Sequence, residues 1–129
     1  SDSSCSRENL RIHMTVTTAK LVEPLPPITL PQHEILEGTP NAGGQFTAAT
    51  PDEQVTAGFW SCDVGRYEFA FDYDEFVYII RGAVTVTVHG TGVVHVLEDG
   101  DTALFPQGVT TTWEITRPVT KYFVARAGR

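Results

Sequence analysis

From Val55 onward, short runs of aromatic and β-branched residues are interrupted every few positions by glycine, aspartate or proline. Such runs are typical of β-strands, and none of them keeps the period of a helix. In the run at 83–89, Val84, Val86 and Val88 alternate with polar residues, so one face is buried and the other is wet. The runs cover residues 57–63, 66–73, 75–81, 83–89, 93–98, 101–106, 110–116 and 121–127. Eight short strands predict an all-β sandwich or barrel.

The N-terminal part of the chain has a different composition. Residues 1–13 are polar, and we expect a flexible tail there, followed by one domain over residues 14–129. The range 14–54 contains six prolines, which exclude long helices and central strands. We therefore predict a proline-rich arm over 14–54, with one early strand at 14–22 where β-branched residues cluster, and a barrel core over 55–125.

Charge and cysteine content limit the partners and the compartment. The net charge of −7 argues against nucleic acid or an anionic membrane as a partner, because both require a basic surface. No run reaches the length needed to span a bilayer, and the first residues lack the apolar core of a secretory signal. The two cysteines, Cys5 and Cys62, do not suggest a disulfide framework. We therefore expect a reduced, cytoplasmic setting, with Cys62 in the core.

Two sets of spaced residues add a more specific constraint. Glu75 is followed, after six intervening residues, by Gly82. Gly100 is followed, after five, by Pro106, and Gly108 comes two places later. We interpret Gly82 as a tight reversal between two strands, and Gly100 as part of a turn into the next strand. Pro106 should end that strand by removing a ladder donor, and Gly108 should free the chain to enter another.

These two sets, with the segments DYDEFVYIIRG and GDTALFPQGVTTTW that contain them, resemble the two motifs of the cupin superfamily. The likeness covers roughly residues 55–124 and is strongest to the small cupin_3 (DUF861-like) subgroup, which is similar to ethanolamine-utilisation cupins and ureidoglycine aminohydrolases. The resemblance implies a single-domain jelly-roll β-barrel of the RmlC-like type. It also implies a homodimer, in which the arm could add to the edge of a partner's sheet.

The metal ligands of the family would be two histidines, a glutamate and a third histidine. At the matching positions this chain has Phe69, Phe71, Glu75 and Thr111. A transition metal needs three or four N, O or S donors at about 2.0–2.3 Å, and one carboxylate beside two phenyl rings does not supply them. We therefore expect neither a metal nor another cofactor there. By strand alternation, the acidic neighbours should face outward: Glu68, Asp72 and Asp74.

The altered site predicts a pocket with aromatic walls around one carboxylate, which suits a flat or apolar small organic ligand with a single polar anchor. Strand alternation places six residues at the barrel mouth: Phe69, Phe71, Tyr73, Glu75, Thr111 and Trp113. Tyr78 and Trp60 are further candidates for ligand contact. Large aromatic residues are also ordinary core residues of small barrels, so packing remains an alternative for each of them.

Glu75 is the candidate catalytic residue. A carboxylate among aromatic rings loses its hydration, which favours its acid form unless a cation or hydrogen-bond donors compensate. That setting is typical of a general acid or base. The alternative is a structural ion pair with Lys121 or Arg66 that ties strands together, because a buried carboxylate needs a partner.

Three functions remain open for this sequence. The first is a metal-independent cupin that binds a small molecule and acts on it through Glu75. The second is a metal-dependent enzyme of the aminohydrolase or dioxygenase type, with non-standard ligands. The third is a binding or regulatory module without chemistry, in which Phe69 and Phe71 simply fill the barrel.

Overall fold

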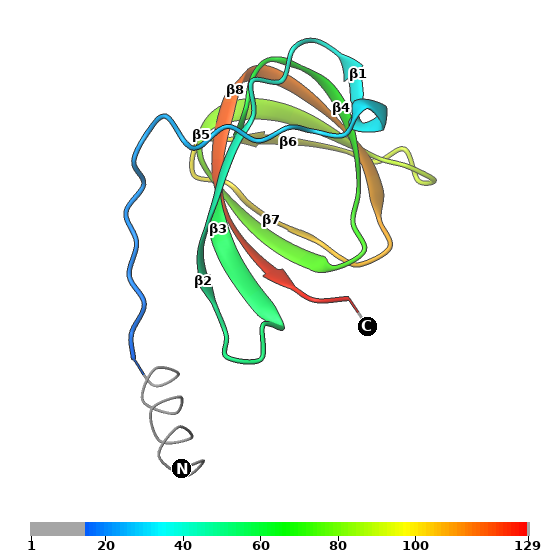
Figure 1. Cartoon of the computed structure of the whole chain (residues 1–129). Coiled ribbons are helices and arrows are strands. Elements are labelled where there is room, and N and C mark those ends of the chain that lie inside the picture. Colours follow the sequence, from blue (N-terminus) through cyan, green and yellow to red (C-terminus); the bar gives the residue numbers. More distant parts are fainter. Residues whose placement is uncertain (1–14, 129) are drawn as a thin grey trace, which may run out of the picture.

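The computed structural model describes residues 15–128, so the tail expected at residues 1–13 lies outside the described part of the chain. Nearly all regular structure is β, in one curled sheet of eight strands, which confirms the all-β prediction (Figure 1). The elements are η1 (Gln32–Glu34), β1 (Ile35–Glu37), β2 (Gly43–Ala49), β3 (Val55–Cys62), β4 (Gly65–Ala70), β5 (Asp74–Val88), β6 (Val94–Glu98), β7 (Thr102–Phe105) and β8 (Thr110–Arg126). No helix in the described range is long and apolar enough to cross a membrane.

The two long strands, β5 and β8, form the centre of the sheet. They pair antiparallel from Asp74 opposite Arg126 to Val88 opposite Thr111. On its other edge β5 pairs first with β7 and then with β6, while β8 pairs first with β4 and then with β3. β1 and β2 extend the sheet beyond β4 and β3. The start of β5 and the end of β8 therefore lie together at one end of the barrel.

Gly82 has the predicted unusual backbone but not the predicted reversal. Its φ is +121°, yet β5 runs straight through it, with register shifts against β8 between Ile79 and Val84. β8 changes partner from β4 to β3 close to Pro118, which has no N–H for the ladder. A Cβ added to Gly82 would lie 2.5 Å from the Pro118 carbonyl oxygen. The glycine is thus a bulge where the two long strands approach closely.

The prediction of separate strands before and after Gly82, and before and after Pro118, was therefore wrong. Four expected runs are halves of two long strands: 75–81 and 83–89 in β5, and 110–116 and 121–127 in β8. The other predicted turns are confirmed. Gly100 has a φ of +88°, β7 ends at Phe105 directly before Pro106, and Gly108 has a φ of +99°.

The arm joins the barrel from about residue 23, where Glu23 pairs with Arg81 of β5. Residues 15–22 form no strand, so the early strand was wrong over its described part, and Val16 is 88% exposed. β-branched residues favour a strand where neighbouring strands pack against them, and this segment has no such pairing. Farther along, Leu25 is buried, and an isolated bridge joins Pro27 to Gly43 of β2. The edge of β2 therefore holds the arm.

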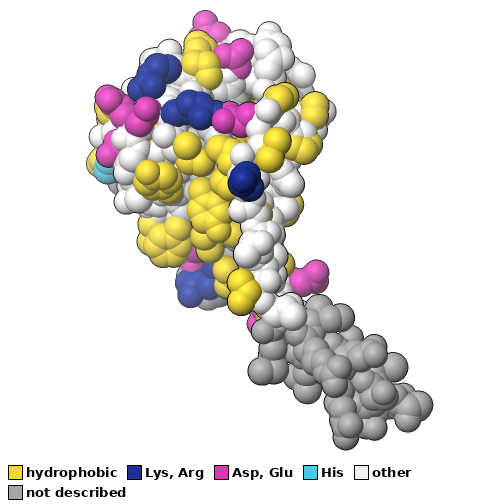
Figure 2. Space-filling view, turned by 90° about the vertical axis from the view of Figure 1, so that its left-hand side faces the viewer, with side chains coloured by type: hydrophobic (Ala, Val, Ile, Leu, Met, Phe, Trp, Pro, Cys, Tyr) yellow, Lys and Arg dark blue, Asp and Glu magenta, His cyan; other side chains and the backbone are white. Residues whose placement is uncertain are grey.

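The core consists of the inward-facing residues of the curled sheet. Tyr67, Ile79 and Trp113 have no exposed surface. On the outer face of β5 and β7, large apolar side chains stay exposed, including Phe76 at 58% and Leu104 at 50%. Figure 2 shows apolar side chains gathered also on the side of the molecule that lies at the left in Figure 1. Alternation along β5 thus separates a buried face from an exposed apolar face.

Candidate functional site

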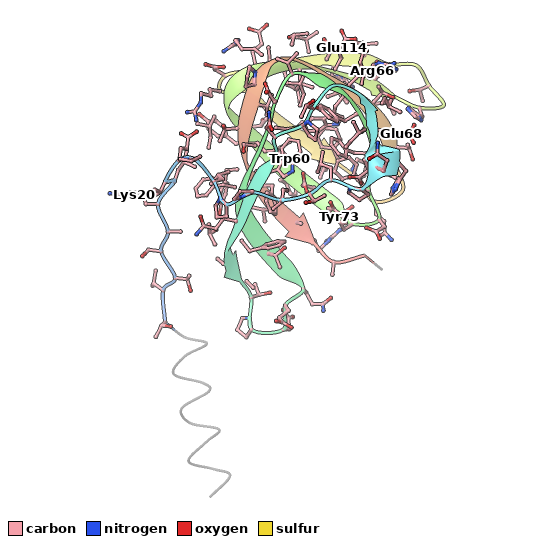
Figure 3. All side chains as sticks on the ribbon, turned by 45° about the horizontal axis from the view of Figure 1, so that its top comes forward. Lys20, Trp60, Arg66, Glu68, Tyr73 and Glu114 are labelled. Carbon is pink, nitrogen blue, oxygen red and sulfur yellow. The ribbon has the colours of Figure 1, made fainter. Side chains whose placement is uncertain are left out.

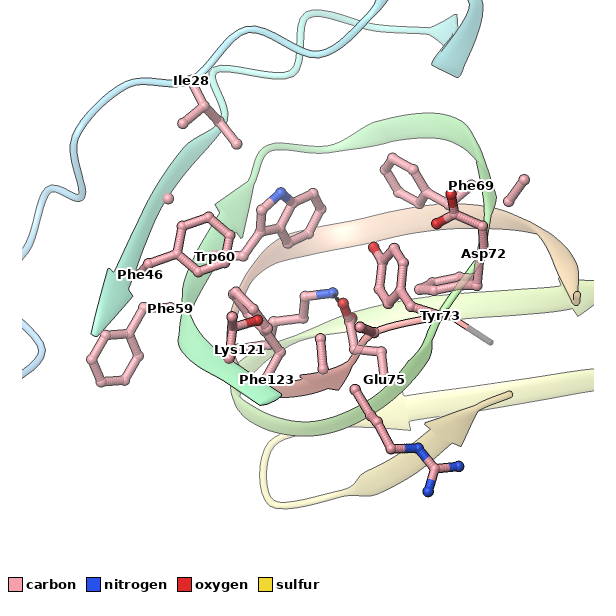
Figure 4. Close-up of a pocket in the computed structure, with 18 of the residues that line it drawn as sticks. Ile28, Phe46, Phe59, Trp60, Phe69, Asp72, Tyr73, Glu75, Lys121 and Phe123 are labelled. Carbon is pink, nitrogen blue, oxygen red and sulfur yellow. Dashed lines mark hydrogen bonds and ion pairs between the residues drawn. The ribbon is translucent and has the colours of Figure 1, made fainter. Parts of the chain in front are cut away.

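A cavity of about 590 Å³ opens at the end of the barrel where β5 begins and β8 ends. Its walls come from the arm, the β2–β3 hairpin, the segment 69–73 and the end of β8 (Figure 4). Five of the predicted site residues line it: Trp60, Phe69, Phe71, Tyr73 and Glu75. The volume lies within the range of small-molecule sites in proteins.

A buried ion pair lies among the lining residues. Lys121 Nζ of β8 donates to Glu75 Oε2 of β5 at 2.7 Å, and the two residues are 6% and 5% exposed. The charge of the same carboxylate also acts on the Tyr73 phenol, whose pKa it raises. Of the two cations expected as alternative partners, Lys121 is therefore the actual one. Arg66 lies outside the barrel, where it pairs with Glu37 at 3.6 Å (Figure 3).

The Lys121 ammonium also lies over aromatic rings. Its Nζ is 4.7 Å from the centroid of Trp60 and 4.9 Å from that of Trp113. Trp60 stands directly opposite Lys121 in the pairing of β3 with β8, which sets this contact. The negative faces of the rings add to the carboxylate in compensating the hydration that the ammonium has lost. The ammonium is thus held from two sides.

Phe69 and Phe71 form one wall of the cavity without filling the barrel. Phe71 is 5% exposed and stacks on Phe105, with 4.8 Å between ring centroids. Phe69 meets Trp60 and Trp113 edge-on, at 5.8 Å and 5.5 Å. Both phenylalanines therefore have core contacts, and both also line the cavity. The filled barrel that the third function supposes is not present.

Three predicted contact residues lie outside the cavity lining. Thr111 and Trp113 have no exposed surface. The Thr111 hydroxyl donates to the Phe69 carbonyl at 3.0 Å and accepts from the Trp113 indole at 3.1 Å, so this pair supports the wall from behind. Tyr78 is 46% exposed, on the outer face of β5. Alternation turns it away, because it is three residues from the inward-facing Glu75.

A second aromatic wall lies opposite and was missed in the sequence. Phe46 and Phe123 line the cavity with their ring centroids 5.8 Å apart. Phe123 follows Lys121 by two places, so alternation along β8 was the available signal for it. Phe46 belongs to β2, in the proline-rich range where no such strand was expected.

Carboxylates gather at the rim of the cavity. Asp72 was expected to face outward and it is exposed, but because β4 ends at Ala70 and the chain bends there, it also lies at the cavity rim. Glu34 reaches the lining from η1 in the arm. Burial raises the pKa of the Glu34 carboxyl, and the neighbouring charge of His33 offsets part of that increase. No sequence pattern signals Glu34, because the fold of an irregular segment decides its place.

Tyr73 connects the rim with the ion pair. Its pKa is raised to about 12, mainly by burial. The charges of Glu75, Asp72 and Glu34 raise it further, because each disfavours a phenolate nearby. Three carboxylates therefore act on one phenol, which stays protonated and able to donate a hydrogen bond at neutral pH.

The donor set at the family's metal positions does not fit a metal ion. Phe69 and Phe71 carry no ligand atom, and the Thr111 hydroxyl is occupied by its two hydrogen bonds. The Glu75 carboxylate already holds the Lys121 ammonium. Among residues 15–128, no three histidine, cysteine, aspartate or glutamate side chains form a group that could hold an ion. The chain itself supplies the positive charge beside Glu75.

Known proteins resemble the chain in sequence and in fold. The family model of the EutQ-like cupin domain matches residues 49–123. A protein of Salmonella typhimurium LT2 assigned as ethanolamine utilization protein Q is 20% identical, with a TM-score of 0.59 over 68% of this chain and 71% of that one. An RmlC-like cupin from Shewanella frigidimarina NCIMB 400 is 21% identical, with a TM-score of 0.59 over 76% of this chain and 86% of that one.

A DUF861 family protein from Pseudomonas syringae pv. tomato DC3000 is 19% identical, with a TM-score of 0.67 over 88% of this chain. The match spans 45% of that protein. No curated protein matches significantly. At these identities the structural likeness shows the fold alone, and it confirms the predicted jelly-roll barrel.

Proposed function

The chain belongs to the EutQ-like cupin domain family, and we propose that it binds a small organic ligand in the cavity at the barrel mouth without using a metal ion. The observation that carries this proposal is the cavity of about 590 Å³ whose aromatic walls surround the Glu75–Lys121 ion pair. An apolar cavity with a few convergent polar groups is the usual form of a small-molecule site.

The ion pair provides the polar anchor for the ligand. The Lys121 ammonium has three donor hydrogens, and the Glu75 carboxylate accepts at two oxygens, so the pair has bonding capacity beyond its own contact. A ligand oxygen accepts from the ammonium, and a ligand O–H or N–H donates to the carboxylate. Because both groups are removed from water, such bonds are stronger than they are at an exposed site.

Acid–base chemistry at the same pair is a second candidate function. The specific observation in its favour is a proton acceptor and a cation 2.7 Å apart among the residues that line the cavity. In this candidate, Glu75 takes a proton from the bound ligand, and the Lys121 ammonium stabilises the negative charge that develops on it. Tyr73, still protonated at neutral pH, donates a further hydrogen bond.

A thermal-melt screen with small aromatic and heteroaromatic compounds tests the binding proposal. A ligand at 100 times its Kd should stabilise the fold by about 2.7 kcal/mol, which raises the Tm by about 10 °C. The isosteric variant Glu75→Gln should weaken binding of the same compounds at least about tenfold, as expected for a lost charged hydrogen bond. Glu98→Gln, an exposed change on β6, is the matched control and should bind as the wild type does. The proposal fails if no compound shifts the Tm, or if Glu75→Gln binds every compound equally well.

Metal analysis separates this proposal from a metal-dependent enzyme. Protein purified without chelator should hold less than about a tenth of an equivalent of Mn, Fe, Ni or Zn, and chelation should leave ligand binding unchanged. Once a reaction of a bound compound is identified, Glu75→Gln should abolish turnover while the far-ultraviolet circular dichroism stays native. A full equivalent of metal that Glu75→Gln loses would point instead to the metal-dependent function.

A further inference from the structure

The cavity lining has more negative than positive side chains. Glu75 is neutralised by Lys121, and Arg126 is held by Asp74 at 3.0 Å. Three more carboxylates belong to the lining: Glu34, Glu53 and Asp72. Within residues 15–128, none of these three forms an ion pair with a lysine or an arginine. The unpaired charge of the cavity is therefore negative.

This negative charge reaches the aromatic walls. The phenol of Tyr73 lines the cavity and experiences the charges of Glu75, Asp72 and Glu34 together. Walls of low dielectric constant strengthen such a field and concentrate it in the opening. A ligand that enters the cavity thus meets a potential that attracts a cation and repels an anion.

The chain already holds one ammonium group against aromatic rings at the side of this cavity. Lys121 Nζ lies 4.7 Å from the Trp60 centroid and 4.9 Å from the Trp113 centroid, with the Glu75 carboxylate at 2.7 Å. Trp60 is only partly buried and lines the cavity, as do Phe69 and other rings of the two walls. Aromatic rings and carboxylates therefore line the cavity together, and these are the same two kinds of group that hold the internal ammonium.

From these observations we infer that the ligand is an organic cation, an ammonium group carried on an aromatic or apolar body. The ammonium lies toward the rim carboxylates Asp72 and Glu34, and the apolar body lies between the aromatic walls with its far end at the Glu75–Lys121 pair that anchors the ligand. This inference rests on the proposed function, because it names the ligand class of the same cavity. It distinguishes the cavity from an anion site, for which the unpaired lining charges have the wrong sign.

Three probes of nearly equal shape test the inference: benzylammonium, benzyl alcohol and benzoate. Their affinities are measured by titration calorimetry at pH 7, at about 20 mM and about 300 mM salt, where the screening lengths differ several-fold. At low salt, benzylammonium should bind about tenfold more tightly than benzyl alcohol, and benzoate should bind most weakly. High salt should narrow these differences, because part of the preference comes from charges at the exposed rim.

Variants at the rim connect the preference to named residues. The double variant Glu34→Gln and Asp72→Asn should lower the preference for benzylammonium over benzyl alcohol to about twofold, while the affinity for benzyl alcohol changes little. Glu98→Gln removes one charge elsewhere and should leave the preference as it is. Two outcomes overturn the inference: equal affinity for benzylammonium and benzyl alcohol, or tightest binding of benzoate. Either outcome leaves the proposed function standing, because a compound still binds in the cavity. Failure of all three probes also overturns the inference, and the wider thermal screen then decides the proposed function separately.

Discussion

Removing the cation from the buried ion pair should lower the free energy of unfolding far more than removing both charges of the pair. In Lys121→Met, the Glu75 carboxylate stays buried at 5% exposure and loses its hydrogen-bonded cation. Breaking a buried pair in this way costs about 3–5 kcal/mol of unfolding free energy. The two ring contacts of the ammonium add about 0.5–1 kcal/mol each. A domain of this kind has about 5–15 kcal/mol in total, so the variant should lose a large part of its stability.

The double variant Lys121→Met and Glu75→Gln should recover most of that loss. It leaves no unpaired charge, so its unfolding free energy should lie within about 1–2 kcal/mol of the wild type. Urea denaturation followed by tryptophan fluorescence gives all four corners of the double-mutant cycle. Arg66→Met is the matched surface control, because its pair with Glu37 is 45% and 74% exposed and contributes about 0–1 kcal/mol. The reasoning is refuted if Lys121→Met costs no more than Arg66→Met, or if the double variant is as unstable as Lys121→Met.

Three further predictions follow from particular residues. Gly82→Ala should cost about 3 kcal/mol or more of unfolding free energy in urea, because its Cβ would lie 2.5 Å from the Pro118 oxygen at a φ of +121°. The control Gly90→Ala, with a φ of +86° and no atom within 4 Å, should cost about 1–2 kcal/mol. Equal costs for the two variants would contradict the close approach of the two long strands. Burial raises the pKa of the Cys62 thiol to about 11. In a Cys5→Ser background, this thiol should therefore react with a disulfide reagent at pH 8 much more slowly in native protein than in urea. Because the folded thiol keeps its proton, its contribution to stability is complete below the unfolded pKa, near 9, and is lost as the pH rises toward 11. We propose the homodimer that the family resemblance implies, with its contact on the exposed apolar face of β5; light scattering should then give twice 14.1 kDa, and Tyr78→Glu should reduce the mass to one chain. A wild-type mass of 14.1 kDa would contradict the homodimer.

The sequence predicted the fold well where local chemistry alone decides it. Gly100, Pro106 and Gly108 act within their own turns, so their spacing identified both the turns and the family. Gly82 was read as a reversal because sequence does not distinguish a bulge from a turn. The difference lies in β8, which approaches Gly82 from far along the chain.

The candidate site was predictable only along regular strands. Alternation along β4 correctly placed Phe69 on the inward side, and Phe71 and Glu75, beyond the end of β4, also line the cavity. The need of a buried carboxylate for a cation named Lys121 as one possible partner of the glutamate. Alternation could not place the exposed Asp72 at the cavity rim, because the strand has already ended there. Residues of the irregular arm, such as Glu34, are placed by tertiary contacts that no local pattern records.

The most direct test of the account follows the two tryptophans by nuclear magnetic resonance. The chain has two tryptophans, so a spectrum of ¹⁵N-labelled protein shows two indole N–H signals, which Trp60→Phe assigns. Trp60 lines the cavity, whereas Trp113 is fully buried behind it with its indole N–H bonded to Thr111. Titration with benzylammonium should move the Trp60 signal to a saturating value and move the Trp113 signal much less. If compounds that raise the Tm leave the Trp60 signal in place, the ligand does not occupy the barrel mouth and the central claim is wrong.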